Sequence, residues 1–378
     1  MSTNHDETVS KQWSKRPADE RYLDLATLQT AVANRRAHSQ EIRESLGELA
    51  VILNDDGDDL RLALPGLDKP AEMTHYSFGS LCSRVGAPAG FFRDRLAHAP
   101  ELAAECLNEC ITRADNEPIM PYVYQNGRTE LRAATSPSYG RIYDADVVAA
   151  VARMNERDNN RWKVPGVLDW GTGIYNPHVD VTAETTTLYA SDRDIFLFMV
   201  DDLNPIKVGT LPNGNDDLMF RGFYVWNSET GNASFGMACM YLRAVCANRI
   251  LWGVEQKKEI TFRHSQNAPG RFLREARPML AHFAQANTAA VVAGVEAAKA
   301  PVLPDERKDK IAWIMKNANV TQVRAVACLN AVEREEHRIC RSVWDVAQGL
   351  TAVARRIPHQ DQRVDLERAA KRILDKVA

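Results

Sequence analysis

The clearest pattern of hydrophobic and polar positions lies at residues 220–242, where two apolar runs flank a cluster of turn-forming residues. The first run, 220–226, is aromatic and β-branched, and the second, 233–242, is apolar with several small residues. Between them, Asn-Ser-Glu-Thr-Gly-Asn at 227–232 consists mainly of residue types that are common in turns. The pattern predicts a β-hairpin, around which we expect the rest of the chain to be organised.

A second hairpin is predicted at residues 121–135, where Asn126-Gly127 separates two strand-like runs. Asn-Gly favours the type I′ turn of two-residue hairpins because both positions tolerate positive φ. Shorter apolar runs predict further strands at 50–54, 60–64, 162–168, 185–190 and 195–200.

Apolar residues recur at helical spacing in two parts of the chain. In the first part, helices are predicted over 23–46, in two short pieces over 74–97, from Pro100 onwards, and over 147–157 with Asp144 as N-cap. In the second part, the helical period continues from Arg271 to the end, with helices at about 270–298, 305–318, 320–336, 339–356 and 362–377.

These elements predict an α+β fold with an antiparallel, hairpin-rich sheet and helices in the N-terminal two thirds, and an all-helical C-terminal third. Residues 1–20 are polar and without periodicity, which predicts a disordered tail. We expect an α+β domain at 21–265 and a helical region at 266–378 that packs on it or extends from it.

Composition narrows the class of protein. The chain has 378 residues, of which 45% are hydrophobic, so it can bury a large core. It contains no run of about 18 apolar residues and no apolar segment near its start, so neither a membrane span nor a signal peptide is predicted. Seven cysteines, an odd number, lie mostly in apolar patterns and favour a reducing cytoplasmic compartment.

The net charge of −3 excludes a uniformly basic surface, so any polyanion site must be local. One window, 243–277, is strongly basic and interleaved with Trp252, Phe262 and Phe272. Cations pair with phosphates and aromatic faces stack on unpaired bases, so the window favours single-stranded nucleic acid. Alternatively, its charges form only the solvated face of a helix. The basic members of the window are Arg243, Arg249, Lys257, Lys258, Arg263, Arg271, Arg274 and Arg277.

Signals for catalysis are weak. The chain has no G-x-S-x-G, H-E-x-x-H or Walker A motif. Asp201-Asp202 and Asp216-Asp217 flank a loop rich in Pro, Gly and Asn, where two metal ions would make a nuclease, or where the acids are simply solvated. Cys106 and Cys110 are interpreted as core residues, since no second ligand pair is near them. The sequence therefore predicts no cofactor, no metal and no catalytic residue, although it leaves open whether any reaction is catalysed.

Several segments resemble a large uncharacterised protein family of phages and plasmids. LRAATSPSYGRIYDADVVAAV is similar to the family's R-A-x-x-S-x-x-Y…D segment, and the hairpin at 223–250 to its N-S-x-x-G…R-x-V-C-x-N segment. THYSFGSLCSRVGAPAGFF, EITFRHSQ and ICRSVWDVAQGLTAV resemble further landmarks, in the family's order, across most of residues 15–375. One departure is Thr230, where the family often has an aspartate before its glycine.

The resemblance implies a protein of mobile elements in the bacterial cytoplasm, encoded near single-strand binding, recombination and anti-defence functions. By its motifs, it marks for testing Arg132, Ser136, Tyr139, Arg243, Cys246, Asn248, Arg263 and His264. The leading hypothesis is a non-enzymatic, single-stranded DNA-binding protein that anneals or maintains DNA, acting as an oligomer. The alternatives are an anti-defence protein that binds a host immune protein through the acidic loop 201–217, and the metal-dependent nuclease.

The predicted nucleic-acid site combines the basic window with a second group of side chains. Phosphates are expected at the cationic residues and stacked bases at the aromatic ones, with DNA and RNA not distinguished. The predicted site residues are Arg132, Tyr139, Arg141, Arg243, Asn248, Arg249, Trp252, Lys257, Lys258 and Arg263.

Overall fold

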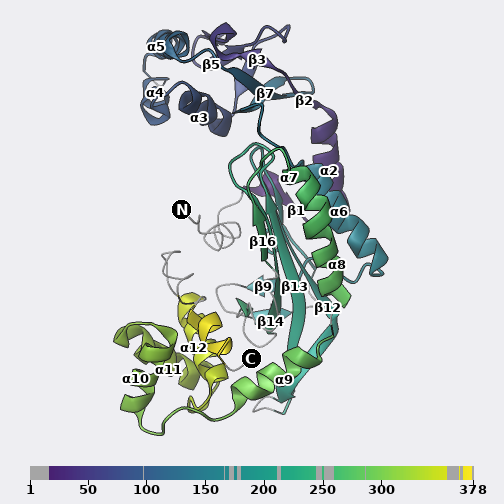
Figure 1. Cartoon of the computed structure of the whole chain (residues 1–378), viewed down its shortest axis with the longest axis vertical. Coiled ribbons are helices and arrows are strands. Elements are labelled where there is room, and N and C mark those ends of the chain that lie inside the picture. The colour runs from purple at the N-terminus through teal and green to yellow at the C-terminus, as the bar shows by residue number, and fades with distance from the viewer. Residues whose placement is uncertain are drawn as a thin grey trace.

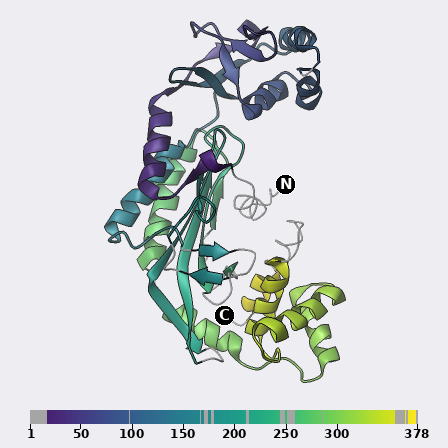
Figure 2. The ribbon, with the colours of Figure 1, turned by 180° about the vertical axis from the view of Figure 1, so that it is seen from behind.

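The computed structural model describes residues 17–96, 98–165, 167–169, 174–176, 180–210, 214–243, 249–250, 259–285, 287–355, 366 and 369–376. Figures 1 and 2 show a curved molecule with three parts along its length. An N-terminal lobe, residues 39–135, lies at one end, a long sheet with helices along it forms the middle, and a group of helices forms the other end.

The central sheet is antiparallel and is built around the predicted hairpin. Its strand order is β1-β11-β12-β13-β14-β15, and β16 also pairs with β14. The hairpin of β13 and β14 is confirmed, with Trp226 opposite Gly236 near the turn and Met219 opposite Arg243 at the far end. The strands are β1 (Arg21–Tyr22), β11 (Leu188–Ala190), β12 (Ile195–Thr210), β13 (Asp216–Asn227), β14 (Phe235–Arg243), β15 (Arg249–Ile250) and β16 (Glu259–Phe262). A separate pair is formed by β9 (Val167–Asp169) and β10 (Ile174–Asn176).

The two faces of the central sheet bury different side chains because successive residues of a strand point to opposite sides. Leu197 and Met199 of β12 belong to the larger hydrophobic core, together with residues of α2 (Leu25–Ala37) and α6 (Asp144–Arg157). On the opposite face, the rings of Tyr189, Phe196, Tyr224 and Trp226 form a buried row with neighbouring centroids 5.5–6.2 Å apart.

The N-terminal lobe has a sheet and a hydrophobic core of its own. The sheet order is β2-β7-β8-β6-β5-β4, with β3 also on β7, and only the β6–β8 pair is parallel among the described strands. The Asn126-Gly127 hairpin is confirmed, and Gly127 has φ +73°. The strands are β2 (Ser39–Glu41), β3 (Glu44–Ser45), β4 (Ala50–Leu53), β5 (Leu60–Ala63), β6 (Ala71–Met73), β7 (Pro118–Gln125) and β8 (Thr129–Thr135), and the helices are α3 (His75–Arg84), α4 (Ala89–Leu96) and α5 (Pro100–Arg113).

Helices follow the last strand of the central sheet. α7 (Ala268–Arg271) leads through η3 (Phe272–Ala276), a π-helical turn, into α8 (Arg277–Gln285), which lies along the sheet beside α6. The remaining helices are α9 (Ala289–Lys299), α10 (Arg307–Ala318), α11 (Gln322–Glu335) and α12 (Val343–Arg355). Their apolar side chains, among them the fully buried Trp344, join the larger core. Short 3-10 turns complete the described elements at Ala18–Glu20 (η1) and Leu46–Glu48 (η2).

The mixed α+β class with antiparallel sheets is confirmed, but several boundaries differ from the prediction. The C-terminal third is not all-helical, since β16 continues the sheet to Phe262. The helix predicted over 23–46 ends at Ala37, and short strands follow it. β12 runs to Thr210 through two irregularities in register, so most of the predicted acidic loop is strand. The predicted domain 21–265 contains the whole N-terminal core and part of the larger one.

Candidate functional site

The polar turn between β13 and β14 is buried where the central sheet meets the N-terminal lobe. Asn227, Ser228, Glu229 and Thr230 are at most 2% exposed, which is unusual for four consecutive polar residues. Buried polar groups require partners, because unpaired ones are costly to remove from water. The hydroxyls of Ser228 and Thr230 both donate to the Arg193 carbonyl, so the turn is held against the segment between β11 and β12.

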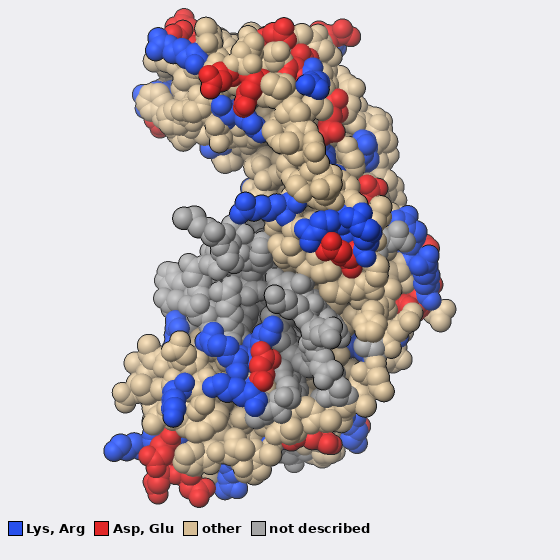
Figure 3. All heavy atoms as spheres, viewed as in Figure 1, with Lys and Arg blue, Asp and Glu red and all other residues tan. Residues whose placement is uncertain are grey.

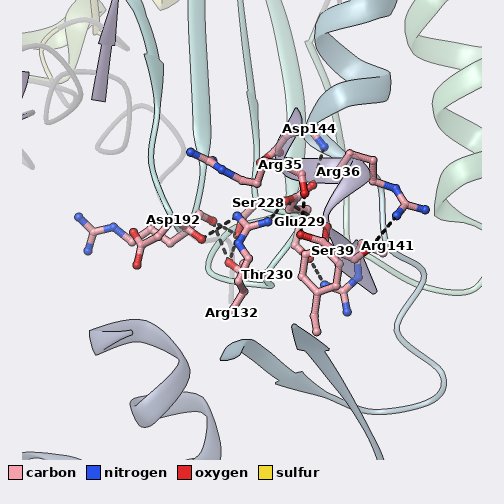
Figure 4. A network of polar contacts seen from close by, with 12 residues as sticks. Arg35, Arg36, Ser39, Arg132, Arg141, Asp144, Asp192, Ser228, Glu229 and Thr230 are labelled. Carbon is pink, nitrogen blue, oxygen red and sulfur yellow. Dashed lines mark hydrogen bonds and ion pairs between the residues drawn. The ribbon is translucent and has the colours of Figure 1, made fainter. Parts of the chain in front are cut away.

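Glu229 forms the centre of this buried network. Its carboxylate forms an ion pair with Arg132 of β8, and its Oε2 accepts a hydrogen bond of 3.0 Å from the Asp144 backbone N–H (Figure 4). Burial alone would raise the pKa of Glu229, but the Arg132 guanidinium and the Asp144 N–H outweigh it, and the pKa is lowered. Glu229 is therefore a buried anion that joins β8 to the hairpin.

The sequence predicted Asp144 as the N-cap of α6, but Asp144 is the first residue of the helix. The N-cap position belongs to Tyr143, and Asp144 is buried with Oδ1 accepting a 2.7 Å hydrogen bond from Asn227 Nδ2. Burial, and then the negative charge of Glu229, raise the pKa of Asp144 well above its ordinary value. Asp144 Oδ2 and Asn227 Oδ1 both lack a hydrogen-bond partner among the described residues, which is uncommon for buried polar atoms.

Arg132 and Arg141, two of the predicted phosphate contacts, face inward. Arg132 is 1% exposed, and its Nη2 donates to the Asp192 carbonyl at 2.9 Å. Arg141 lies over the Tyr122 ring, donates to Glu41 at 2.8 Å and to the Glu229 carbonyl, and is also buried. Both guanidinium groups therefore bind partners inside the protein, where the N-terminal lobe meets the central sheet.

Tyr139 and His264 bring the two sequence regions of the predicted site together. Their rings stack with centroids 5.0 Å apart, and His264 Nδ1 accepts a 3.4 Å hydrogen bond from the Ile142 N–H. Burial lowers the pKa of His264 to about 4, so the ring is neutral at pH 7. The Tyr139 hydroxyl donates to the Ser228 carbonyl at 3.1 Å. Thus the segment after β8 and the segment after β16 do meet, at the buried turn.

An open cleft of about 820 Å³ lies between this turn and α3 and α4 of the N-terminal lobe. Three arginines from separate elements line it: Arg84 of α3, Arg93 of α4 and Arg193 before β12. Arg84 pairs with Glu117 at 3.3 Å and Arg93 donates to the His75 carbonyl at 2.6 Å, whereas Arg193 is exposed. Figure 3 shows the surface hollowed below the N-terminal lobe, with Lys and Arg side chains gathered beside the hollow.

The wall of the cleft carries aromatic and small polar groups. Tyr76 and Tyr139 line the cleft, together with Thr230, Gly231 and Asn232 of the turn. Gly231 has φ +98°, and a Cβ there would contact the hydroxyls of both tyrosines. Glu117 is the one carboxylate among the described lining residues, so the lining has an excess of positive charge.

The other predicted site residues are less informative. Arg263 is exposed, directly after β16. Arg243 and Arg249 lie on β14 and β15, opposite Met219 and Leu242, but their side chains are outside the described residues. Ser136 shares a 2.9 Å hydrogen bond with Ser138. Asn248, Trp252, Lys257, Lys258 and Cys246 all lie outside the described residues.

The described carboxylates of the predicted nuclease site do not converge. Asp201 is buried within 3.5 Å of Arg161, Asp216 pairs with Lys207 at 2.5 Å, and Asp217 pairs with Lys299 at 3.1 Å. Asp201 is opposite Arg221, whereas Asp217 is opposite Gly209, well along the same hairpin. The part of the chain that the structure describes holds no group of three or more potential metal ligands. Of the described acids in the loop that the anti-defence hypothesis names, Asp201 and Asp217 are buried and Asp216 is exposed.

The sequence analysis did not single out Arg93, Arg193 or Glu229, and it assigned Asp144 as a helix N-cap and not as part of a site. Arg193 lies between two aspartates in SDRD, and Arg93 lies beside Asp94 and Arg95 in FFRDR, so neither segment is strongly basic in a count of local charge. Glu229 gave a usable signal, since it is the one charged residue in a turn between two strongly apolar strands.

The fold and site define an α+β protein with two hydrophobic cores and a polar hairpin turn buried beside a basic cleft. A family model described as Domain of unknown function (DUF932) matches residues 166–371, more than half of the chain, and the protein belongs to this family. No curated protein and no solved structure matches the chain. The predicted membership of an uncharacterised family is thereby confirmed. None of the described helices combines the length and apolar character needed to cross a membrane.

Proposed function

We propose that the protein binds single-stranded nucleic acid in the basic cleft between the N-terminal lobe and the buried hairpin turn. The observation that carries this proposal is the convergence of Arg84, Arg93 and Arg193, from three elements, on one open cleft with a single described carboxylate. Guanidinium groups bind phosphate oxygens in bidentate fashion, and an excess of them in a concave surface attracts a polyanion.

Tyr76 of α3 gives the cleft a second property suited to this ligand. Aromatic side chains that line a basic groove stack on bases of any sequence, whereas paired bases in a duplex are not available for stacking. The cleft volume of about 820 Å³ suits a short stretch of an unpaired strand. The arginines would hold phosphates and Tyr76 would contact a base, whereas the Tyr139 ring already packs against His264 and Arg141, with no reaction catalysed.

The biological setting that we propose follows from the resemblance described above. Proteins of phages and plasmids act where single strands are exposed during replication and recombination. Binding of such strands in the cytoplasm of a bacterial host, leading to annealing or maintenance of DNA, is the role that we propose for this chain.

The proposal is tested by substitution of Arg93 and Arg193, the two cleft arginines without a carboxylate partner among the described residues. Arg93→Gln with Arg193→Gln should weaken binding of a fluorescent single-stranded oligonucleotide, measured by anisotropy over a series of salt concentrations. Each phosphate contact contributes about 0.7 to the slope of log affinity against log salt, so loss of two contacts should reduce the slope by about 1.4.

A matched control removes two arginines elsewhere. Arg113 on α5 and Arg324 on α11 are outside the cleft, so Arg113→Gln with Arg324→Gln should leave both affinity and slope nearly unchanged. If the unaltered protein binds no oligonucleotide at low salt, or if the two double variants have equal slopes, the cleft is not a nucleic-acid site.

A further inference from the structure

A second cavity, of about 120 Å³, lies between α6, the π-helical turn η3, α8 and the central sheet. Its walls are formed mainly by buried apolar side chains, including Val151, Met154, Val225, Phe235, Phe272 and Ala276. Protein cores are packed as densely as organic crystals and rarely contain voids larger than a water molecule. An apolar cavity of this size is poorly suited to water, which needs polar partners, but is suited to a compact apolar group.

Two arginines on α6 give this cavity a charged mouth. Arg153 and Arg157 line it, are exposed, and lie four residues apart on one face of the helix. Neither has an ion-pair partner among the described residues. Asp158, the one carboxylate in the described lining, accepts a 2.9 Å hydrogen bond from Trp162 Nε1 and lies within 3.6 Å of Arg161.

The wall opposite α6 contains the π-helical turn. Phe272 and Ala276 are the first and last residues of η3, and both line the cavity. π-Helical turns are rare and occur frequently at functional sites, because the extra residue per turn displaces side chains from regular packing. Here the displacement coincides with the void, which indicates that the turn shapes it.

We propose that this cavity binds a small organic anion that carries one compact apolar group, in particular an aromatic or branched-chain carboxylate. The apolar group would fill the cavity, and the carboxylate would accept hydrogen bonds from Arg153 and Arg157. A dry cavity of about 150 Å³ is known to hold one benzene ring, so a single ring is the upper limit of size here. The site is separate from the basic cleft and does not depend on the function proposed for it.

Calorimetric titration with three probes tests both the apolar cavity and the two arginines at its mouth. Benzoate should bind, benzyl alcohol should bind about tenfold more weakly because it lacks the charge, and acetate should not bind because it lacks the ring. With Arg153→Gln and Arg157→Gln together, benzoate affinity should fall to that of benzyl alcohol. With Ala150→Leu, which fills the cavity and keeps both arginines, binding of benzoate and benzyl alcohol should be lost.

Arg324→Gln on α11 is the matched control and should bind benzoate like the unaltered protein. The two arginines are exposed, so their replacement should leave the folded state intact, as circular dichroism will check. The proposal is overturned if the folded protein does not bind benzoate at millimolar concentration, or if the double glutamine variant binds it with unchanged affinity.

Discussion

Arg132 and Arg128 lie four residues apart at and beside β8, yet their guanidinium groups are in opposite environments. Arg132 is 1% exposed and pairs with Glu229, whereas the Arg128 side chain is 60% exposed and pairs with Glu130 at 2.8 Å. Attraction in a buried site is stronger than in water, and so is the cost of leaving one partner alone. The two arginines are equivalent in the sequence. Their burial in the fold gives Arg132 a structural role and leaves Arg128 on the surface.

Removal of the buried cation should therefore be severe. Arg132→Met leaves Glu229 as a buried anion without its counter-charge, and we expect a loss of about 3–5 kcal/mol in the free energy of unfolding. Arg128→Met removes an exposed pair and should cost less than about 1 kcal/mol. Urea titration of both variants measures the two values, and equal losses would show that the Arg132 pair is not the buried link described here.

Asp144 predicts a dependence of stability on pH. Its pKa is raised in the folded protein, so between 3.8 and the raised value the folded state binds more protons than the unfolded state. The free energy of unfolding then falls as pH rises through this window. Asp144→Asn cannot ionise, so the variant should gain stability relative to the unaltered protein as pH increases. Urea titrations over a pH series measure this difference, and a difference that is constant with pH would contradict a protonated Asp144.

At the scale of elements, the hairpin of β13 and β14 combines tight packing near its turn with a buried polar turn. Gly236 lies opposite Trp226, and a Cβ on this glycine would come within 1.8 Å of the indole ring. The ring therefore covers the glycine and occupies the space that a side chain would need. Such a pairing fixes the register of the two strands, and the register in turn places Glu229 at the turn.

Gly236→Ala should destabilise the protein by about 1–3 kcal/mol, since overpacking in a core has costs of this size. Trp226→Leu removes the clashing ring, so the double variant should be more stable than the sum of the two single losses predicts. A double-mutant cycle by urea titration measures the coupling. Strictly additive losses would show that the indole does not occupy the space above Gly236.

At the scale of the whole molecule, the chain builds two separate hydrophobic cores. The smaller lies within residues 46–131, and the larger joins both ends of the chain around the central sheet. The N-terminal lobe is therefore inserted between α2 and α6, which both pack on the larger core. Polar contacts of Glu229, Arg132 and Arg141 link the two parts at the joint.

We expect the two cores to unfold at different urea concentrations, because few apolar contacts bind them into one cooperative unit. Every tryptophan lies outside residues 39–135, so tryptophan fluorescence reports parts of the chain outside the N-terminal lobe, whereas far-ultraviolet circular dichroism reports both parts. The two curves should not coincide, and Arg132→Met should separate them further. Superimposable curves would instead indicate a single cooperative unit.

Local signals determined much of the fold. The Asn126-Gly127 turn and the apolar runs on either side of 227–232 specify their hairpins through dihedral preferences and period-two burial, which depend only on neighbouring residues. The same is true of most helices after Ala268. Prediction failed where long-range pairing prevailed: β12 continues past Pro205 because β13 supplies partners on both sides of an irregularity in register.

The sequence by itself determined the α+β class, the two hairpins and the amounts of charge in each segment. Only the tertiary structure decided which charges face solvent, because pairing joins residues as distant as Arg132 and Glu229 and burial depends on what packs around them. In the tertiary structure, Arg132 and Arg141 are buried. Three other arginines, Arg84, Arg93 and Arg193, line one cleft. Charge is a property of composition, but a binding surface is a property of spatial arrangement.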